Sequence, residues 1–383
     1  MIELRKFVAP EFVYGNGAIS LVARYAANFG ARKPLLVTDP GVLNAGWGDV
    51  VLGELRKEGI DCAIFPDISQ NPCDFQVMSG AEFYREKGCD VIIAVGGGSP
   101  MDCAKAIGIV CTNHEFVTAF EGVDNVPVPG PPLICIPTTA GTSADVSQFA
   151  IINNTEKKTK FAIISKTMVP DVALIDPAAT LTMDGYLTAC TGMDALVHAI
   201  EALVSTAHSP ITDIHAMQAI RLIRQALPLA IKNPGDSEVR DLMMLGSLEA
   251  GLAFSNASLG AVHALAHSLG GFLDLPHGEC NAILLGPVIS YNFGSAPERY
   301  RIVADCLGLP VKDMNDSALR AALLKDIADL RQCLGITVTL GSRGLRREHL
   351  PFLAAHAIVD PCMVTNPRVP TQQDIEEIYA GAV

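Results

Sequence analysis

The chain has 383 residues, of which 49% are hydrophobic and 18% are charged, and its formal net charge at pH 7 is -13. The length predicts two domains with a cleft between them, and the apolar content excludes a disordered chain. The acidic balance argues against a nucleic-acid partner, because phosphate binding depends on clustered Lys and Arg. Eleven cysteines without a CxxC pair indicate reduced thiols, and therefore a cytoplasmic protein.

No membrane association is expected from the sequence. The N-terminal MIELRKFVAPEF carries charges and a proline where a signal peptide would be apolar. Residues 251–273 contain no Asp, Glu, Lys or Arg and so invite interpretation as a membrane span. However, this stretch includes His263, His267 and Asn256, which favour a buried helix that carries polar side chains.

The first half of the chain alternates short apolar runs with helical patterns. Helical spacing of apolar residues occurs at 47–58 and 74–87, and strand-like runs occur at 34–38, 62–65, 91–95, 133–136, 161–164 and 172–175. This alternation predicts a mostly parallel, Rossmann-like sheet covered by helices, in a domain that spans residues 1–180.

Long helical patterns dominate the second half, where convincing strands are scarce. Helices are expected at 184–205, 210–232, 237–254, 261–272, 317–334 and 371–382. Residues 181–383 should therefore form an all-helical domain.

A glycine turn, Gly96-Gly97-Gly98, follows the predicted strand 91–95 and precedes a helical segment. Backbone N–H groups and the positive end of a helix dipole can hold a phosphate there. Ser99 is the expected N-cap, and Pro100 the expected first helical residue. The turn departs from GxGxxG, so a tight connection without a ligand is an alternative interpretation.

A second loop, residues 137–143 (PTTAGTS), follows the strand 133–136 and offers hydroxyl groups and a second helix start. Two such loops at the carboxyl ends of parallel strands should meet at one crevice, where open α/β sheets bind ligands. Together they favour binding of a dinucleotide phosphate.

Asp39 ends the first predicted strand of the sheet, where its carboxylate could accept hydrogen bonds from ribose hydroxyls. A turn-forming Asp before Pro40 explains the residue equally well. Counting about 20 residues from the glycines points to Glu121 instead. Sequence spacing leaves these alternatives open.

Polar side chains at helical spacing form the second constellation. Asp194 and His198 lie four residues apart on one helix, His263 and His267 repeat the spacing, and His277 follows in a Pro-His-Gly turn. A lone His on an apolar helix is usually a satisfied core residue. Two such pairs and a third His favour a divalent cation, although spacing alone does not select four ligands from five candidates.

Several motifs resemble the iron-containing (group III) alcohol dehydrogenases, in the branch that includes lactaldehyde reductase and the short-chain primary alcohol dehydrogenases. The similarity covers essentially the whole chain. The motifs are GGGSPMDCAKAIG at 96–108, IPTTAGTSADVS at 136–147, GMDALVHAIEA at 192–202, GAVHALAHSLGGFLDLPHGECNAILL at 260–285 and NPRVPTQQDIEEIY at 366–379.

The resemblance implies NAD and a divalent metal, Fe2+ by family, with Zn2+ or another cation as the alternative. It implies Asp194, His198, His263 and His277 as metal ligands. His267 matches a position beside the substrate and is a candidate proton carrier, so His267 and His277 are the expected catalytic residues. Along the cofactor it implies Asp39, Asn71, Gly97, Gly98, Ser99, Asp102, Thr138, Thr139, Ser143, Phe149 and Lys160.

Phe254 and Cys362 match substrate-pocket positions of the family, and ordinary core packing is the alternative for each. The chain departs from the family at Asp145, where Glu is common, and at Gly286-Pro287, where a turn beside a helix should be altered. Neither position is a proposed ligand.

These features predict a metal-dependent enzyme that transfers a hydride between NAD(H) and small primary alcohols or aldehydes, working as a homo-oligomer, a dimer or larger. The alternatives are a glycerol dehydrogenase-like or dehydroquinate-synthase-like enzyme on the same scaffold, or a non-catalytic metal- or nucleotide-binding protein.

Overall fold

The computed structural model describes residues 5–383. By its contacts this part of the chain divides into two compact units, an α/β unit of residues 8–182 and a helical unit of residues 183–383 that also includes residues 5–7. Each unit has its own core.

The main sheet of the α/β unit has six strands in the order β1-β9-β6-β4-β2-β3, and all its neighbouring pairs are parallel. The predicted parallel sheet is therefore confirmed. The strands are β1 (Glu11–Tyr14), β2 (Pro34–Val37), β3 (Ala63–Phe65), β4 (Val91–Gly96), β6 (Leu133–Pro137) and β9 (Val172–Ile175).

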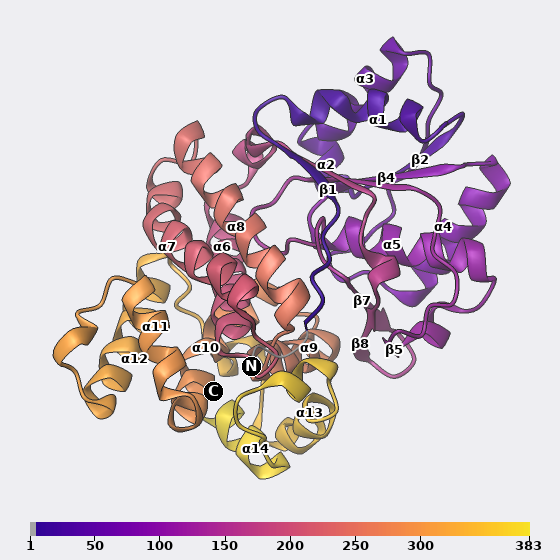
Figure 1. Ribbon diagram of the computed structural model, residues 1–383. Coiled ribbons are helices and arrows are strands. Elements are labelled where there is room, and N and C mark those ends of the chain that lie inside the picture. The colour runs from indigo at the N-terminus through magenta and orange to yellow at the C-terminus, as the bar shows by residue number, and fades with distance from the viewer. Residues whose placement is uncertain (1–4) are drawn as a thin grey trace. The chain divides into compact units, whose positions relative to one another are not determined.

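Helices cover both faces of this sheet (Figure 1). They are α1 (Val22–Asn28), α2 (Pro40–Asn44), α3 (Trp47–Lys57), α4 (Asp74–Lys87) and α5 (Gly98–Asn113). Because side chains alternate along a strand, Leu36 and Ile93 join the core under α1 and α3, whereas Leu35 and Ile92 join the core under α4 and α5.

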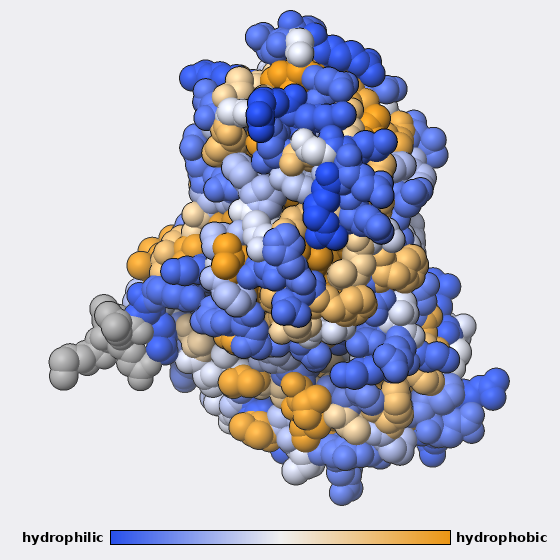
Figure 2. All heavy atoms as spheres, turned by 90° about the vertical axis from the view of Figure 1, so that its right-hand side faces the viewer, coloured by the Kyte–Doolittle hydropathy of each residue, from blue (hydrophilic) through white to orange (hydrophobic). Residues whose placement is uncertain are grey.

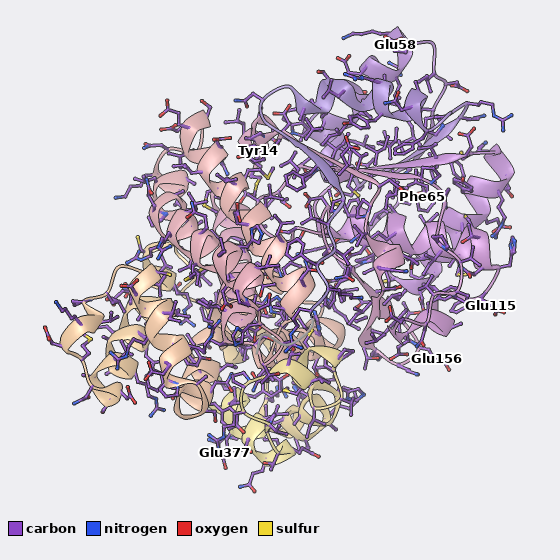
Figure 3. The ribbon with its side chains drawn as sticks, viewed as in Figure 1. Tyr14, Glu58, Phe65, Glu115, Glu156 and Glu377 are labelled. Carbon is purple, nitrogen blue, oxygen red and sulfur yellow. The ribbon has the colours of Figure 1, made fainter. Side chains whose placement is uncertain are left out.

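The periphery of the unit is charged while its centre is apolar. In Figure 3, Glu58, Glu115 and Glu156 extend from the outside of this unit, and Phe65 lies inside it. Such a distribution is that of an ordinary folded α/β domain.

A second, smaller sheet was not expected from the sequence. It consists of β5 (Gly122–Val123), β8 (Thr159–Ile164) and β7 (Phe149–Asn154), and β7 and β8 form an antiparallel hairpin. The apolar run 161–164 was expected among the alternating strands and helices of the main sheet, which is wrong. A hairpin partner only a few residues away satisfies its backbone hydrogen bonds instead.

The helical unit contains no strand between residues 183 and 383, which confirms the all-helical prediction. Its helices are α6 (Gly185–Val204), α7 (Pro210–Lys232), α8 (Ser237–Ala257), α9 (Ala261–Leu273), α10 (His277–Asn292), α11 (Pro297–Cys306), α12 (Asp316–Cys333), α13 (Leu350–Ala357) and α14 (Gln372–Ala380).

One helix in the described part of the chain, α6, is long and apolar enough to cross a membrane, but 89% of its most apolar window is buried inside the structure. Its apolar character therefore matches its place in the core. On the face shown in Figure 2, apolar side chains lie in small groups among polar ones.

Candidate active site

The glycine turn connects β4 to α5 and packs tightly against its surroundings. A Cβ atom at Gly97 would lie 3.2 Å from the side chain of Thr139, and one at Gly98 would lie 3.1 Å from the side chain of Thr142. Glycine therefore allows the two predicted loops to approach, and the backbone N–H of Thr138 donates to the carbonyl of Gly96 at 2.9 Å. The structure brings both loops together at the carboxyl ends of β4 and β6, as the sequence predicts.

Two local details of these loops differ from the prediction. Helix α5 begins at Gly98 with Gly97 as its N-cap, so Ser99 is already helical and its hydroxyl instead donates to the carbonyl of Gln70. No helix follows the second loop, because Ser143 adopts a left-handed conformation (φ +51°) and the chain turns into β7. The predicted second helix start is therefore wrong.

Asp39 follows β2 and is the N-cap of α2, where its Oδ1 accepts from the N–H of Val42 at 2.9 Å. A Cβ atom at Gly96 would lie 2.7 Å from the side chain of Pro100 and 3.3 Å from that of Val42. The Asp39 carboxylate therefore lies at the start of α2, the helix whose Val42 is close to the glycine turn. Glu121, the alternative from spacing, is an exposed residue just before β5 in the other sheet.

The remaining predicted cofactor residues also lie in the α/β unit. Lys160 donates to the side-chain oxygen of Asn71 at 2.7 Å, and Asp102 accepts from the backbone N–H of Ile151 at 3.1 Å. Burial raises the pKa of Asp102 to about 6, although the charge of Lys105 opposes the shift. Phe149 is buried at the start of β7.

In the helical unit, α6, α9 and α10 bring a carboxylate and three imidazoles together. Asp194 Oδ1 lies 3.6 Å from Nε2 of His263, 3.7 Å from Nε2 of His277 and 3.9 Å from Nε2 of His198. Two ligands of a tetrahedral ion at about 2.1 Å from it are about 3.4 Å apart, so these separations fit one divalent cation. The donor set, one carboxylate and imidazole nitrogens, fits Fe2+ or Zn2+.

Neighbouring groups in the cluster shift the pKa values of Asp194 and His263. Burial opposes ionisation of Asp194, but the imidazoles of His198, His277 and His263 hold the pKa of its carboxyl well below its usual range. Burial likewise opposes a charged His263, yet hydrogen bonds to Asp194 and Glu201 raise its pKa to about 9. The cluster therefore attracts positive charge.

Glu201, one turn after His198 on α6, contacts Nδ1 of His263, the ring nitrogen that does not face Asp194. Its Oε2 lies 2.6 Å from Nδ1 of His263, and its Oε1 accepts from the N–H of Val262 at 2.7 Å in the first turn of α9. A carboxylate only accepts, so Nδ1 carries a hydrogen, and Nε2, which faces Asp194, is the nitrogen that would bind a metal.

A buried amide, Asn281 of α10, lies against the same cluster. Its Nδ2 is 2.6 Å from Oδ1 of Asp194, 3.2 Å from Nε2 of His263 and 3.1 Å from Nε2 of His277. Its Oδ1 is buried and has no hydrogen-bond partner among the described residues.

His267, one turn beyond His263 on α9, is paired with a carboxylate from another segment. Its Nδ1 lies 2.9 Å from Oδ2 of Asp360, whose other oxygen accepts from the N–H of Cys362 at 2.8 Å. Although burial opposes ionisation, the His267 imidazole lowers the pKa of Asp360. His267 also stacks on His277, with ring centroids 5.3 Å apart.

The two predicted pocket residues are both buried beside the imidazoles. Phe254 of α8 stacks on His198 with centroids 4.2 Å apart. Cys362 lies with His267 and Asp360, their ligand atoms within 4.8 Å of one another. Burial raises the pKa of the Cys362 thiol well above its usual value, so the thiol is neutral and apolar in character.

The sequence interpretation missed Glu201, Asn281 and Asp360. Glu201 and Asn281 each stand three or four residues after a predicted ligand on a helix, a spacing that could have indicated them. Asp360 lies 93 residues from its partner His267, and no local pattern connects them.

Two expectations about α10 are corrected. His277 was expected in a turn, but it is the first residue of α10, which follows the N-cap Pro276. Gly286 and Pro287 were expected to flank a helix, and they lie inside α10. Pro276 cannot donate a backbone hydrogen bond, which suits a position just before a helix rather than an extended loop.

Comparison with known proteins agrees with this geometry. Residues 9–177 match the family model "Iron-containing alcohol dehydrogenase", and residues 188–383 match "Fe-containing alcohol dehydrogenase family, C-terminal". The chain is 37% identical to the NAD-dependent methanol dehydrogenase of Bacillus methanolicus over 98% of this chain and 99% of that protein. It is 38% identical to the lactaldehyde reductase of Escherichia coli over 96% and 97% of the two chains.

A solved structure of a 1,3-propanediol oxidoreductase superimposes with a TM-score of 0.96 at 38% identity, over the full length of both chains. The fold and the site thus define an alcohol dehydrogenase of the metal-dependent class. The chain belongs to the iron-containing alcohol dehydrogenase family.

Proposed function

We propose that the protein interconverts small primary alcohols and their aldehydes with NAD(H), using Fe2+ held by Asp194, His198, His263 and His277. The convergence of one carboxylate and three imidazole Nε2 atoms from α6, α9 and α10 is the observation that carries this proposal. When bound, the cation supplies positive charge that polarises an alcohol or carbonyl oxygen.

The protein's own residues would then orient the reactants and move the proton. The Asp360 carboxylate keeps the hydrogen of His267 on Nδ1, so Nε2 is free to accept or return the proton of the alcohol. Phe254 and Cys362 would provide apolar surface for a short carbon chain.

The α/β unit is proposed as the NAD-binding domain and the helical unit as the metal-binding domain. The start of α5 and the adjacent 137–143 loop would hold the diphosphate, and Asp39 would accept the adenosine ribose hydroxyls. The other cofactor residues proposed are Asn71, Gly97, Gly98, Ser99, Asp102, Thr138, Thr139, Ser143, Phe149 and Lys160.

We further propose a cytoplasmic homo-oligomer. All eleven cysteines are free thiols, and eight of them are buried. Reduced thiols of this kind are typical of a reducing compartment.

The test is anaerobic purification with metal analysis, followed by NADH absorbance assays with ethanol, 1-propanol, 1,2-propanediol, 1,3-propanediol and 2-propanol. We expect one divalent ion per chain and higher kcat/KM for the primary alcohols than for 2-propanol. Asp194→Ala should lose both metal and turnover, because three remaining ligands hold a labile ion too weakly. Turnover that survives without bound metal, or 2-propanol as the best substrate, would contradict the proposal.

A further inference from the structure

Lys105 of α5 is a buried cation whose ammonium group holds three oxygen atoms of one short segment. The residue lies in the α/β unit and is 3% exposed. Its Nζ donates to the carbonyl of Ser147 at 2.9 Å, to the hydroxyl of Ser147 at 3.2 Å and to the carbonyl of Phe149 at 2.8 Å. An ammonium group has three hydrogens, so all of its donors are used. Burial of a charge is unfavourable unless the group is bonded in this way, which commits Lys105 to this segment.

The segment that Lys105 holds leads into the open edge of the small sheet. In that sheet β7 is an outer strand, with β8 as its neighbour. Gln148 accepts from the N–H of Ser165 on the β8 side, and successive residues of a strand direct their backbone groups to opposite edges. The backbone groups of Phe149 and Ile151 therefore face away from β8.

Two side chains of α5 bond to this edge in place of a neighbouring strand. Helix α5 packs on β7 (Figure 1). Lys105 donates to the carbonyl of Phe149, and Asp102, one turn earlier on α5, accepts from the N–H of Ile151 at 3.1 Å. Burial lowers the pKa of Lys105 and raises that of Asp102, and the charge of each opposes the shift of the other. The helix and the small sheet are thus joined through two buried groups of opposite charge.

The helix and the small sheet carry different parts of the proposed NAD site. The start of α5 is proposed to hold the diphosphate, and Asp39 the adenosine ribose. Phe149 of β7 and Lys160 of β8 are then left for the nicotinamide and its ribose. Because one covalent molecule must reach both places, the small sheet has to lie at a defined position relative to α5.

We propose that Lys105 is a positioning residue for NAD: by tying the entry of β7 to α5, it fixes the nicotinamide end of the site relative to the diphosphate end. It acts through Phe149 and the backbone of β7 rather than by contact with the cofactor. This inference deepens the proposed function and rests on its NAD site. It also assigns a role to the lysine of the motif at 96–108.

The first measurement compares the affinities of NAD and ADP for the full-length protein and its variants by isothermal titration calorimetry. ADP carries the adenosine and both phosphates but lacks the nicotinamide and its ribose. Lys105→Met keeps the apolar stem and removes the charge and the donors, so NAD binding should weaken at least about tenfold and ADP binding less than about twofold. Ser147→Ala removes one of the three acceptors and should weaken NAD binding about twofold to threefold. This milder variant provides the test if Lys105→Met does not fold.

Arg240→Met is the matched control. Arg240 is 1% exposed in the helical unit, and its guanidinium likewise donates to three oxygen atoms, the carbonyls of Pro234 and Met183 and the hydroxyl of Thr188. Loss of this buried cation should lower the midpoint of urea unfolding and leave the affinities for NAD and ADP unchanged.

The second measurement is hydrogen exchange of the protein without nucleotide, which locates the change. Lys105→Met should speed exchange in residues 147–154 and leave β2 and β4 unchanged. Wild-type NAD affinity in Lys105→Met would overturn the inference, as would an equal loss of NAD and ADP affinity or equally faster exchange throughout the α/β unit. Wild-type protein that binds neither NAD nor ADP would instead contradict the proposed function itself.

Discussion

Glu201 decides which nitrogen of His263 is free to bind a metal. Its two carboxylate oxygens accept from His263 Nδ1 and from the N–H of Val262, and both contacts are buried. Glutamine has one acceptor oxygen, so it can satisfy only one of these donors, and its NH2 group would favour the wrong tautomer of His263.

We predict that Glu201→Gln weakens metal binding by about 10- to 100-fold, as measured by chelator competition. Glu249→Gln is a matched control, because Glu249 of α8 contacts Nδ1 of His215 on α7 at the same 2.6 Å distance, and His215 is not a proposed ligand. If the two variants bound metal with equal affinity, Glu201 would not be the residue that determines the tautomer of His263.

Asp39 combines a structural and a proposed specificity role. We predict that wild type prefers NAD and that Asp39→Gly improves kcat/KM with NADP at least about tenfold, because a carboxylate repels a 2′-phosphate. Replacing the N-cap by Gly costs only a few tenths of a kcal/mol, so the unfolding midpoint should change little.

Asp39→Asn separates the two roles, since Asn keeps the N-cap hydrogen bond to Val42 and removes the charge. If NADP use remained low in both variants, the ribose assignment of Asp39 would be wrong.

At the scale of elements, the metal cluster depends on how closely α10 approaches α6. A side chain at Gly278 would begin 2.3 Å from the backbone oxygen of Cys190, which is too short for any real contact. Gly278 therefore allows His277, its neighbour in the first turn of α10, to reach Asp194.

We predict that Gly278→Ala moves the start of α10 away from α6, lowers the free energy of unfolding by roughly 1–3 kcal/mol and weakens metal binding. Gly286→Ala is the control on the same helix, because a side chain there meets no atom within 4 Å. That change should be neutral or slightly stabilising. Urea unfolding and metal titration of both variants provide the check, and equal metal affinity would mean that α10 adapts without moving His277.

Helix boundaries were predictable where caps and periodicity agree. Residues 74–87 and 210–232 were expected as helices and are α4 and α7, the latter with Ser209 as N-cap and Pro210 as first residue. The 137–143 loop was misjudged because its hydroxyl-rich sequence resembles a helix start, while the positive φ of Ser143 and the hairpin that follows favour a turn.

At the scale of the molecule, every proposed metal ligand belongs to the helical unit. Metal binding should therefore stabilise α6, α9 and α10, which contribute the ligands, and leave the sheet of the α/β unit unchanged.

We predict that removing the metal with a chelator speeds hydrogen exchange in α6, α9 and α10 and has little effect on β2, β4 and β6. At a free metal concentration 1,000 times Kd the ion contributes about 4 kcal/mol, which is large enough to measure. Uniform loss of protection across both units would contradict a site confined to the helical unit.

Three features could be predicted from the amino-acid sequence: the change from an α/β to a helical pattern along the chain, the glycine turn after a buried strand, and the polar residues at helical spacing. These are local properties, because side-chain period, helix caps and turn residues act over a few positions. The clustering of Asp194, His198, His263 and His277 became visible only in the folded chain, as did the contacts that Glu201, Asn281 and Asp360 make with His263, Asp194 and His267. The partners in those contacts lie 62 to 93 residues apart in the chain, as in Glu201–His263, Asn281–Asp194 and His267–Asp360. The first two pairs meet because α6, α9 and α10 pack together, and the third because the segment after α13 packs on α9. Hydrophobic burial drives this packing and is non-directional, so a local sequence pattern does not reveal which helices meet.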